Sequence, residues 1–189
     1  MSAASDVTRL RATFGEKIVT AVEFRGEQTL LVELDAVHAV LTECRQALDY
    51  AMVLDIASVD LLGEEPRFEV VYEIASVDDA KRLRVKTKVA VDVAVPTVTD
   101  LWGGADWHER EVWDMMGIPF ANHPNLKRIL MWEGYPFFPL RKDFPLAGRP
   151  SDMPDVAFSD VAPMVGGPFV TCAGGANTVV REPRARPVE

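Results

Sequence analysis

The sequence predicts an α+β domain in which helices pack on a mixed, largely antiparallel sheet, followed by an extended arm rich in proline and glycine. Before Gly134, segments with the two-residue period of strands alternate with segments of helical period, which is typical of an α+β fold. From Gly134 onward the chain holds nine of its 13 prolines and six of its 12 glycines, which excludes a regular helix or a central strand there. We therefore expect a domain of residues 1–133 and an arm of residues 134–189, which still carries enough large apolar side chains to lie on another surface.

The chain begins with an expected helix and hairpin. Ser5 is a candidate N-cap for a short helix that Gly15 ends. Residues 17–25 and 29–34 carry β-branched and alternating apolar residues on either side of Arg25-Gly26-Glu27-Gln28. This pattern predicts a β-hairpin with its turn at that tetrapeptide.

A second helix and two more strands follow. Asp35 is expected to cap a helix in which the apolar residues, Cys44 among them, recur at the helical period, so Cys44 is interpreted as a core residue. Residues 67–74 and 82–91 each alternate apolar with polar side chains. Such alternation is typical of an antiparallel sheet with one buried face.

Bulk composition excludes several classes of function. The formal net charge of −9 argues against a nucleic-acid surface and against attraction to anionic lipid. The sequence has no apolar run of the roughly 20 residues that span a bilayer and no signal-peptide pattern. With two distant cysteines and no disulfide framework, we expect a reducing cytoplasm, with membrane association only through partners.

The segment from Asp106 to Met116 is expected to be a well-specified helix. Asp106 is the predicted N-cap, Glu109 completes a capping-box-like pair, and Gly117 ends the helix. Arg110 is expected to pair with Asp114, four residues on. Trp107, Glu111 and Met115 are expected to share another face.

A sequence motif with characteristic residues at fixed spacing begins in this helix. Glu109-Arg110-Glu111 is followed after two residues by Asp114-Met115-Met116, after six more by His123, and after three more by Lys127-Arg128-Ile129-Leu130. Downstream lies Arg141-Lys142-Asp143-Phe144-Pro145-Leu146. The run resembles the signature of the C subunit of bacterial respiratory complex I, whose mitochondrial counterpart is the iron–sulfur-protein 3 subunit. The similarity covers roughly residues 10–148.

The resemblance implies a structural subunit in the peripheral arm of a proton-translocating NADH–quinone oxidoreductase, on the cytoplasmic side of the cell membrane. In that family the complex moves electrons from NADH through FMN and iron–sulfur centres, carried by other subunits, to quinone. It implies contacts with the D and B subunits of the complex. An alternative is the homologous scaffold subunit of a membrane-bound hydrogenase or a ferredoxin-dependent quinone reductase, because the sequence does not disclose the electron donor.

The residues themselves favour an interface over a catalytic site. The segment from 102 to 132 holds all four tryptophans, and aromatic and arginine side chains commonly anchor protein interfaces. We therefore expect family signature and interface roles for Glu109, Arg110, Glu111, Asp114, His123, Lys127, Arg128, Arg141, Lys142 and Asp143.

A catalytic site formed by this chain alone is less well supported by the sequence than an interface. A metal enzyme or hydrolase would use His108, Glu111 and Asp114, but the order of residues is not His-Glu-x-x-His. Two cysteines cannot supply the four thiolates of an iron–sulfur cluster, and no phosphate-binding glycine loop is present. We therefore predict no catalytic residue, no metal site and no cofactor bound by this chain.

Overall fold

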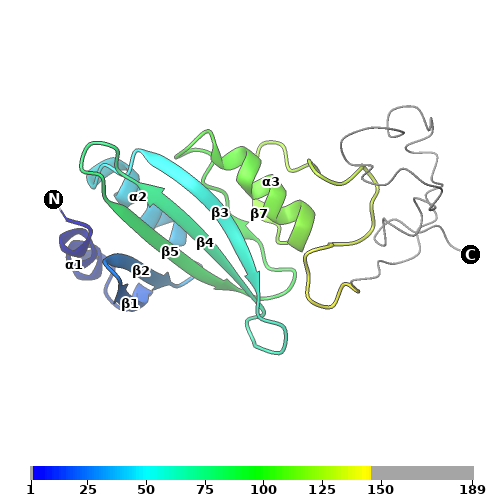
Figure 1. Cartoon of the computed structure of the whole chain (residues 1–189), viewed down its shortest axis with the longest axis horizontal. Coiled ribbons are helices and arrows are strands. Elements are labelled where there is room, and N and C mark those ends of the chain that lie inside the picture. Colours follow the sequence, from blue (N-terminus) through cyan, green and yellow to red (C-terminus); the bar gives the residue numbers. More distant parts are fainter. Residues whose placement is uncertain (1, 146–189) are drawn as a thin grey trace, which may run out of the picture. The chain divides into compact units, whose positions relative to one another are not determined.

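The computed structural model describes residues 2–145 and has an α+β fold built on a five-stranded sheet (Figure 1). The elements in chain order are α1 (Ala3–Phe14), the 3-10 helix η1 (Gly15–Lys17), β1 (Ile18–Phe24), β2 (Glu27–Val32), α2 (Val37–Ala47), β3 (Met52–Asp60), β4 (Phe68–Ala75), β5 (Arg82–Val89), β6 (Val95–Pro96), α3 (Ala105–Met116) and β7 (Phe120–Ala121). The strand order in the large sheet is β1-β2-β5-β4-β3. Strands β2 and β5 are parallel, and the other neighbours are antiparallel, which confirms the predicted mixed sheet.

The residues up to Arg141 form one compact unit, and the chain divides at Lys142. Residues 146–189 lie outside the described residues, so the extended arm and its boundary at residue 134 stay predictions. Among residues 2–145, no helix is long and apolar enough to span a membrane.

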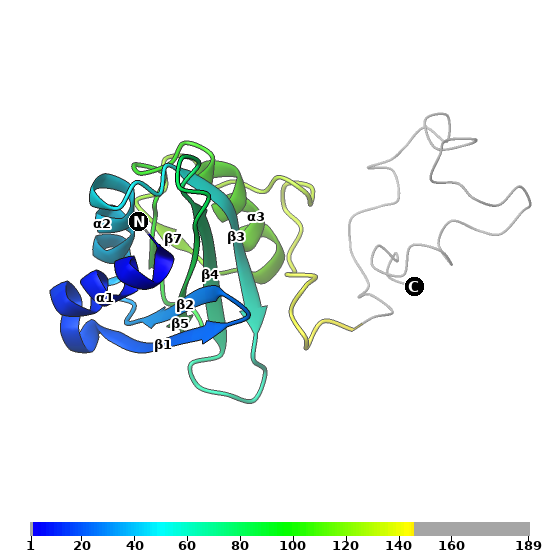
Figure 2. The same cartoon turned by 60° about the vertical axis from the view of Figure 1, so that its left-hand side comes forward.

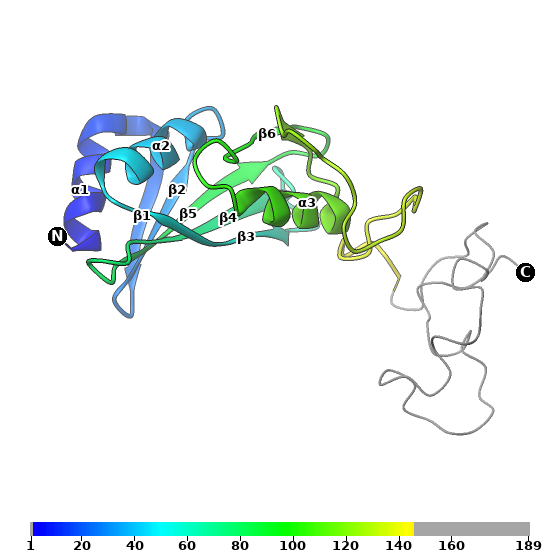
Figure 3. The same cartoon turned by 90° about the horizontal axis from the view of Figure 1, so that it is seen from above.

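One face of the sheet and all three helices share a single hydrophobic core. Along β4, Phe68, Val70, Tyr72 and Ile74 alternate with half-exposed residues and are almost fully buried. The core also contains Leu10 of α1, Cys44 of α2, and Val112 of α3. Figure 3 shows α1, α2 and α3 following one another along the sheet. The predicted alternation of the strands and the core position of Cys44 are confirmed.

The hairpin forms where it is predicted, at one edge of the sheet and beside α1 (Figure 2). Arg25 and Gly26 both have positive φ, and Phe24 pairs directly with Glu27. Two residues with positive φ make the type I′ turn, whose twist matches that of the strands. The turn is therefore tighter than the predicted tetrapeptide.

The predicted N-caps of α1 and α2 are wrong. Helix α1 begins earlier, because Ser2 and not Ser5 is its N-cap: the Ser2 hydroxyl accepts the Ser5 N–H at 3.3 Å. Helix α2 starts after Ala36, without a side-chain cap, and the Asp35 carboxylate pairs instead with Lys17. In both cases the predicted polar residue lies near the helix start but does not occupy the N-cap position.

Helix α3 connects two short parallel strands, β6 and β7, and packs beside β3. Val112, Met116 and Ala105 of α3 belong to the core. Gly117 ends α3 in the left-handed conformation, with φ of +73°, as predicted. This arrangement places α3 between the residues that follow β6 and the segment after β7.

Candidate functional site

Asp114 holds the segment after β7 on α3. Its side chain is fully buried, and Oδ2 accepts the backbone N–H groups of Ile129, Leu130 and Met131 at 2.8–3.0 Å. Oδ1 accepts from the Arg128 guanidinium. Burial opposes ionisation, but these four donors outweigh it and hold the pKa of the Asp114 carboxyl below its usual range. The predicted pair between Arg110 and Asp114 is wrong, because Asp114 faces this segment instead.

Arg128 is enclosed by aromatic rings. Its guanidinium carbon lies 5.5 Å from the Trp113 ring centre, 5.7 Å from Tyr135 and 5.3 Å from Phe138. It also donates to the carbonyl oxygen of Phe137 at 3.3 Å. Cations gain from aromatic faces at such distances, most when water is excluded. Arg128 therefore stabilises the fold of residues 128–138 through contacts within the chain.

Glu109 is a second buried carboxyl, and its partners lie before α3. Its Oε1 accepts the Val98 N–H at 2.7 Å, and its Oε2 accepts the Thr97 hydroxyl. Burial raises the pKa of the Glu109 carboxyl to about 7, although both hydrogen bonds favour ionisation. The predicted N-cap Asp106 and its capping box with Glu109 are both wrong, because α3 starts after Gly104 without a side-chain cap.

His123 completes this buried polar cluster. The N–H of Asn125 donates to Nδ1 at 3.0 Å, which leaves Nε2 as the ring nitrogen that can donate a hydrogen bond. That nitrogen lies 3.3 Å from the Asp106 carbonyl oxygen and 3.8 Å from Oε2 of Glu109. The His123 side chain is fully buried. Its role is to join the start of α3 to the segment after β7.

Arg110, Glu111 and Lys127 lie nearer the surface. Arg110 donates to the Lys127 carbonyl oxygen at 3.1 Å and lies 3.7 Å from the Asp106 carboxylate. Its guanidinium also covers the Trp107 ring at 5.1 Å. Glu111 and the Lys127 side chain are exposed. Met115, the third member of the predicted shared face, is buried.

Arg141 anchors the end of the first unit. Its Nε donates to the Met116 carbonyl oxygen at 2.6 Å, and its guanidinium lies over the rings of Phe68 and Phe138. A Cβ at Gly117 would come within 2.6 Å of both Phe138 and Arg141, so only glycine fits there. Lys142 and Asp143 belong to the next unit, and both are exposed. Interface roles for these residues stay predictions.

The proposed hydrolytic residues are not brought together. His108 pairs with Asp55 at 3.1 Å, Asp114 is buried against residues 128–131, and Glu111 is exposed. Within residues 2–145, no three residues of the metal-ligating types are grouped to hold an ion.

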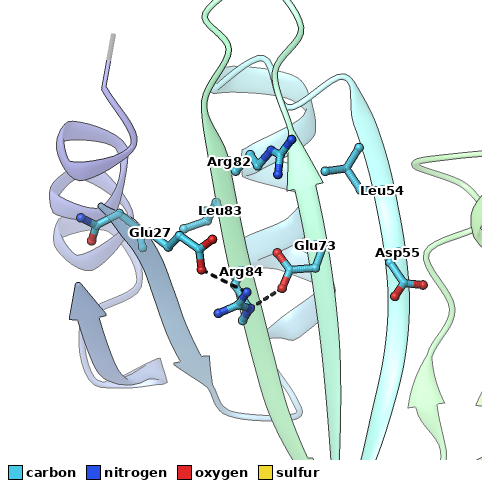
Figure 4. A pocket seen from close by; sticks show the side chains of 8 residues that line it. Glu27, Leu54, Asp55, Glu73, Arg82, Leu83 and Arg84 are labelled. Atoms are coloured by element: carbon cyan, nitrogen blue, oxygen red, sulfur yellow. Dashed lines mark hydrogen bonds and ion pairs between the residues drawn. The ribbon is translucent and has the colours of Figure 1, made fainter. Parts of the chain in front are cut away.

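A hollow of about 220 Å³ opens on the other face of the sheet (Figure 4). There Arg84 is shared between Glu73 of β4 and Glu27 of β2. Lys86 pairs with Glu69 on the same face, at 2.8 Å. The hollow itself is lined mainly by charged side chains, and none of its lining residues is a serine, threonine, cysteine or lysine that could act as a nucleophile.

Sequence reasoning missed two kinds of partner. Thr97 and Val98 were not selected, although the Thr97 hydroxyl and the Val98 N–H donate to the Glu109 carboxyl. The ion pair in which Arg67 donates two hydrogen bonds to Asp60, at 2.8–2.9 Å, was not predicted either. Asp60 is embedded in an apolar segment and is 3% exposed. A carboxylate in such a segment needs a partner, so this pattern is a signal that could have pointed to Arg67.

Comparison with known proteins places these features in a family. Residues 30–150 match the family model described as the respiratory-chain NADH dehydrogenase 30 kDa subunit. The chain is 43% identical over 143 residues to the C subunit of the NADH-quinone oxidoreductase of Citrifermentans bemidjiense, covering 75% of this chain and 89% of that protein. It is 42% identical to the corresponding C subunit of Roseiflexus sp., covering 82% and 88%.

A solved structure shares the fold. It is a chain in the membrane-bound sulfane sulfur reductase, described as an archaeal respiratory membrane complex, with a TM-score of 0.67 and 19% identity. The match covers 92% of this chain and 95% of that chain.

Proposed function

The chain belongs to the family of the respiratory-chain NADH dehydrogenase 30 kDa subunit, and from this premise we propose that it is a non-catalytic structural subunit of the proton-translocating NADH–quinone oxidoreductase, complex I. In this proposal the complex transfers electrons from NADH through FMN and iron–sulfur centres to quinone. The chain itself binds none of these groups. It lies in the peripheral arm on the cytoplasmic side of the membrane and contacts the D and B subunits.

One observation supports a structural role above all. Polar residues of the family run bind the chain's own backbone where they are buried or half-buried: Asp114 accepts three N–H groups, and Arg141 donates to a carbonyl oxygen of α3. Carboxylates and guanidinium groups engaged in this way are not free to bind substrate or transfer protons. They hold residues 123–141 in a fixed shape on α3. A fixed surface of this kind suits a subunit that positions its neighbours.

The cysteine content supports the proposal that electron carriers belong to other subunits. The chain has two cysteines, and Cys44 is buried in the core of α2. Iron–sulfur clusters are usually held by four cysteine thiolates. Burial also raises the pKa of the Cys44 thiol, which disfavours the thiolate that a cluster needs.

Native purification of the tagged full chain tests the proposal. We expect several redox subunits to co-purify, with FMN, iron and NADH-dependent quinone reduction in the assembly. The chain released from the complex should contain none of these groups. A stoichiometric flavin or iron centre on the released chain would contradict a cofactor-free role, and purification without any redox subunit would contradict membership of the complex.

A second candidate is the equivalent scaffold in a membrane-bound hydrogenase or a ferredoxin-dependent quinone reductase. It is favoured by the fold shared with a chain of another respiratory membrane complex. The same purified assembly distinguishes the two, because the second predicts reduction by ferredoxin or hydrogen and no NADH-binding flavoprotein. Electron transfer from NADH favours the first.

A further inference from the structure

Trp107 differs from the other tryptophans of the chain. Trp102 is 5% exposed and donates its indole N–H to the Tyr50 carbonyl oxygen, and Trp113 and Trp132 are partly buried. Trp107, on the outer side of α3, is 62% exposed. An indole left this far in water contributes little to the core of its own domain. Its exposed ring is therefore available to a partner.

The Trp107 ring is held in place although it is exposed. The Arg110 guanidinium lies 5.1 Å from the ring centre, and Arg110 is itself fixed by the Lys127 carbonyl oxygen and the Asp106 carboxylate. One side of the ring is thus supported, and most of its surface still faces solvent. A large aromatic side chain that is already ordered loses little entropy when it binds a partner.

The charge beside Trp107 selects the kind of partner. Glu111 lies four residues further along α3, so it neighbours Trp107 on the same helix face. The other carboxylates of α3 are engaged: Asp114 binds Arg128, Asp106 lies near Arg110, and Glu109 is buried. Glu111 is exposed and has no ion-pair partner within the described part of the chain. It is thus a carboxylate available next to an aromatic surface.

We propose that Trp107 and Glu111 form a docking site for a cationic side chain on a neighbouring protein subunit. This inference rests on the proposed function, because it assumes an assembly of several subunits. An arginine or lysine of the partner stacks on Trp107 and pairs with the Glu111 carboxylate, which combines a cation–π contact with a charge-assisted hydrogen bond. The formal charge of −9 on this chain agrees with a basic partner surface and disfavours anionic lipid as the occupant.

Two substitutions in the full chain, studied in the natively purified complex, test the site. Trp107→Ala removes the aromatic surface, and Glu111→Lys reverses the charge. Each variant has a matched control. Phe24→Ala removes a 66% exposed ring that is also covered by an arginine, Arg25. Glu16→Lys reverses the charge of an exposed glutamate that is distant from Glu111 in the sequence. We expect about tenfold less recovery of the partner subunits with both test variants, as at an interface anchor, and less than about twofold change with the controls.

An aromatic photo-crosslinking residue at position 107, which keeps a ring at the site, identifies the occupant. The expected product joins it to a peptide of another subunit that contains arginine or lysine. Crosslinks only to residues 146–189 of the same chain, only to lipid, or to an acidic surface would overturn the proposal. Wild-type recovery with either test variant would overturn it as well, provided that the amount of soluble full chain is unchanged.

The proposed function fails in a different way. If the wild-type chain brings down no redox subunits, membership of the complex is wrong. If redox subunits co-purify equally with wild type and with both test variants, only the docking site is wrong.

Discussion

Nε2 of His123 lies 3.8 Å from Oε2 of Glu109, and neither side chain has any surface exposed to solvent. Nδ1 of the ring accepts the Asn125 N–H at 3.0 Å. Burial is the main cause that raises the pKa of Glu109, to about 7, and Asp100 and Asp106 act in the same direction.

This raised pKa predicts how stability depends on pH. The folded chain binds more protons than the unfolded chain between the ordinary pKa of 4.5 and the folded value of about 7. The contribution of protonated Glu109 is therefore complete below the lower value and is lost as pH rises through the upper one. Since one pKa unit corresponds to about 1.4 kcal/mol, the loss reaches about 3 kcal/mol.

Glu109→Gln is the direct check, because glutamine resembles the protonated carboxyl at every pH. Denaturant unfolding between pH 5 and pH 8 should show the wild type losing stability relative to Glu109→Gln as pH rises. Parallel stability curves for the two proteins would show that Glu109 does not titrate in this range.

The strands could be predicted from the sequence for a simple physical reason. One face of the sheet is buried, so Phe68, Val70 and Tyr72 must alternate with polar residues, and this period is visible in the chain. The end of α3 could also be predicted, since Gly117 adopts a positive φ that other residues avoid. Helix starts were harder to predict, because several residues near each start could serve as the N-cap. In α1 the N-cap is Ser2, whereas Ser5 was expected.

The contacts of the candidate site could be predicted only in part. Asp114 and Arg110 were expected to pair because they are four residues apart, yet Asp114 binds N–H groups 15 to 17 residues away. Backbone N–H groups occur at almost every residue and leave no pattern in a sequence. Which carboxylate receives them is decided by how the segment after β7 folds back, and local spacing does not contain that information.

Asp114→Asn should destabilise the domain by about 3 kcal/mol, because asparagine carries no charge for Arg128 and turns an N–H₂ group toward existing donors. Thermal unfolding of the purified chain measures this loss. Glu111→Gln, an exposed change on the same helix, is the control and should lie within about 0.5 kcal/mol of wild type. Equal melting temperatures for both variants would contradict the role given to Asp114.

Gly117→Ala should be destabilising by about 2–4 kcal/mol. The new methyl group would require a left-handed backbone and would displace the Phe138 ring and the Arg141 guanidinium. Gly103→Ala is a matched control, because a Cβ at Gly103 meets no atom within 4 Å. Calorimetry of both variants separates the local clash from a general effect of replacing glycine. A Gly117→Ala protein as stable as Gly103→Ala would mean that Phe138 and Arg141 move aside at no cost.

Arg128→Lys keeps the charge and tests whether the shape of the guanidinium matters. Lysine cannot lie flat among three aromatic rings while donating both to Asp114 and to the Phe137 carbonyl oxygen. We expect a loss of about 2 kcal/mol in the free energy of unfolding, together with faster proteolysis within residues 128–138. Lys127→Arg, at the exposed neighbouring position, should change neither quantity.

The double variant Asp114→Asn with Arg128→Lys decides whether the two side chains act as one unit. Because they are in direct contact, the second change should cost less in the presence of the first, and the combined loss should fall short of the sum by about 1 kcal/mol or more. Strict additivity would mean that Asp114 and Arg128 stabilise residues 128–138 independently. In that case the aromatic rings, and not the buried ion pair, would fix the Arg128 side chain, and Arg128→Met would retain most of the wild-type stability.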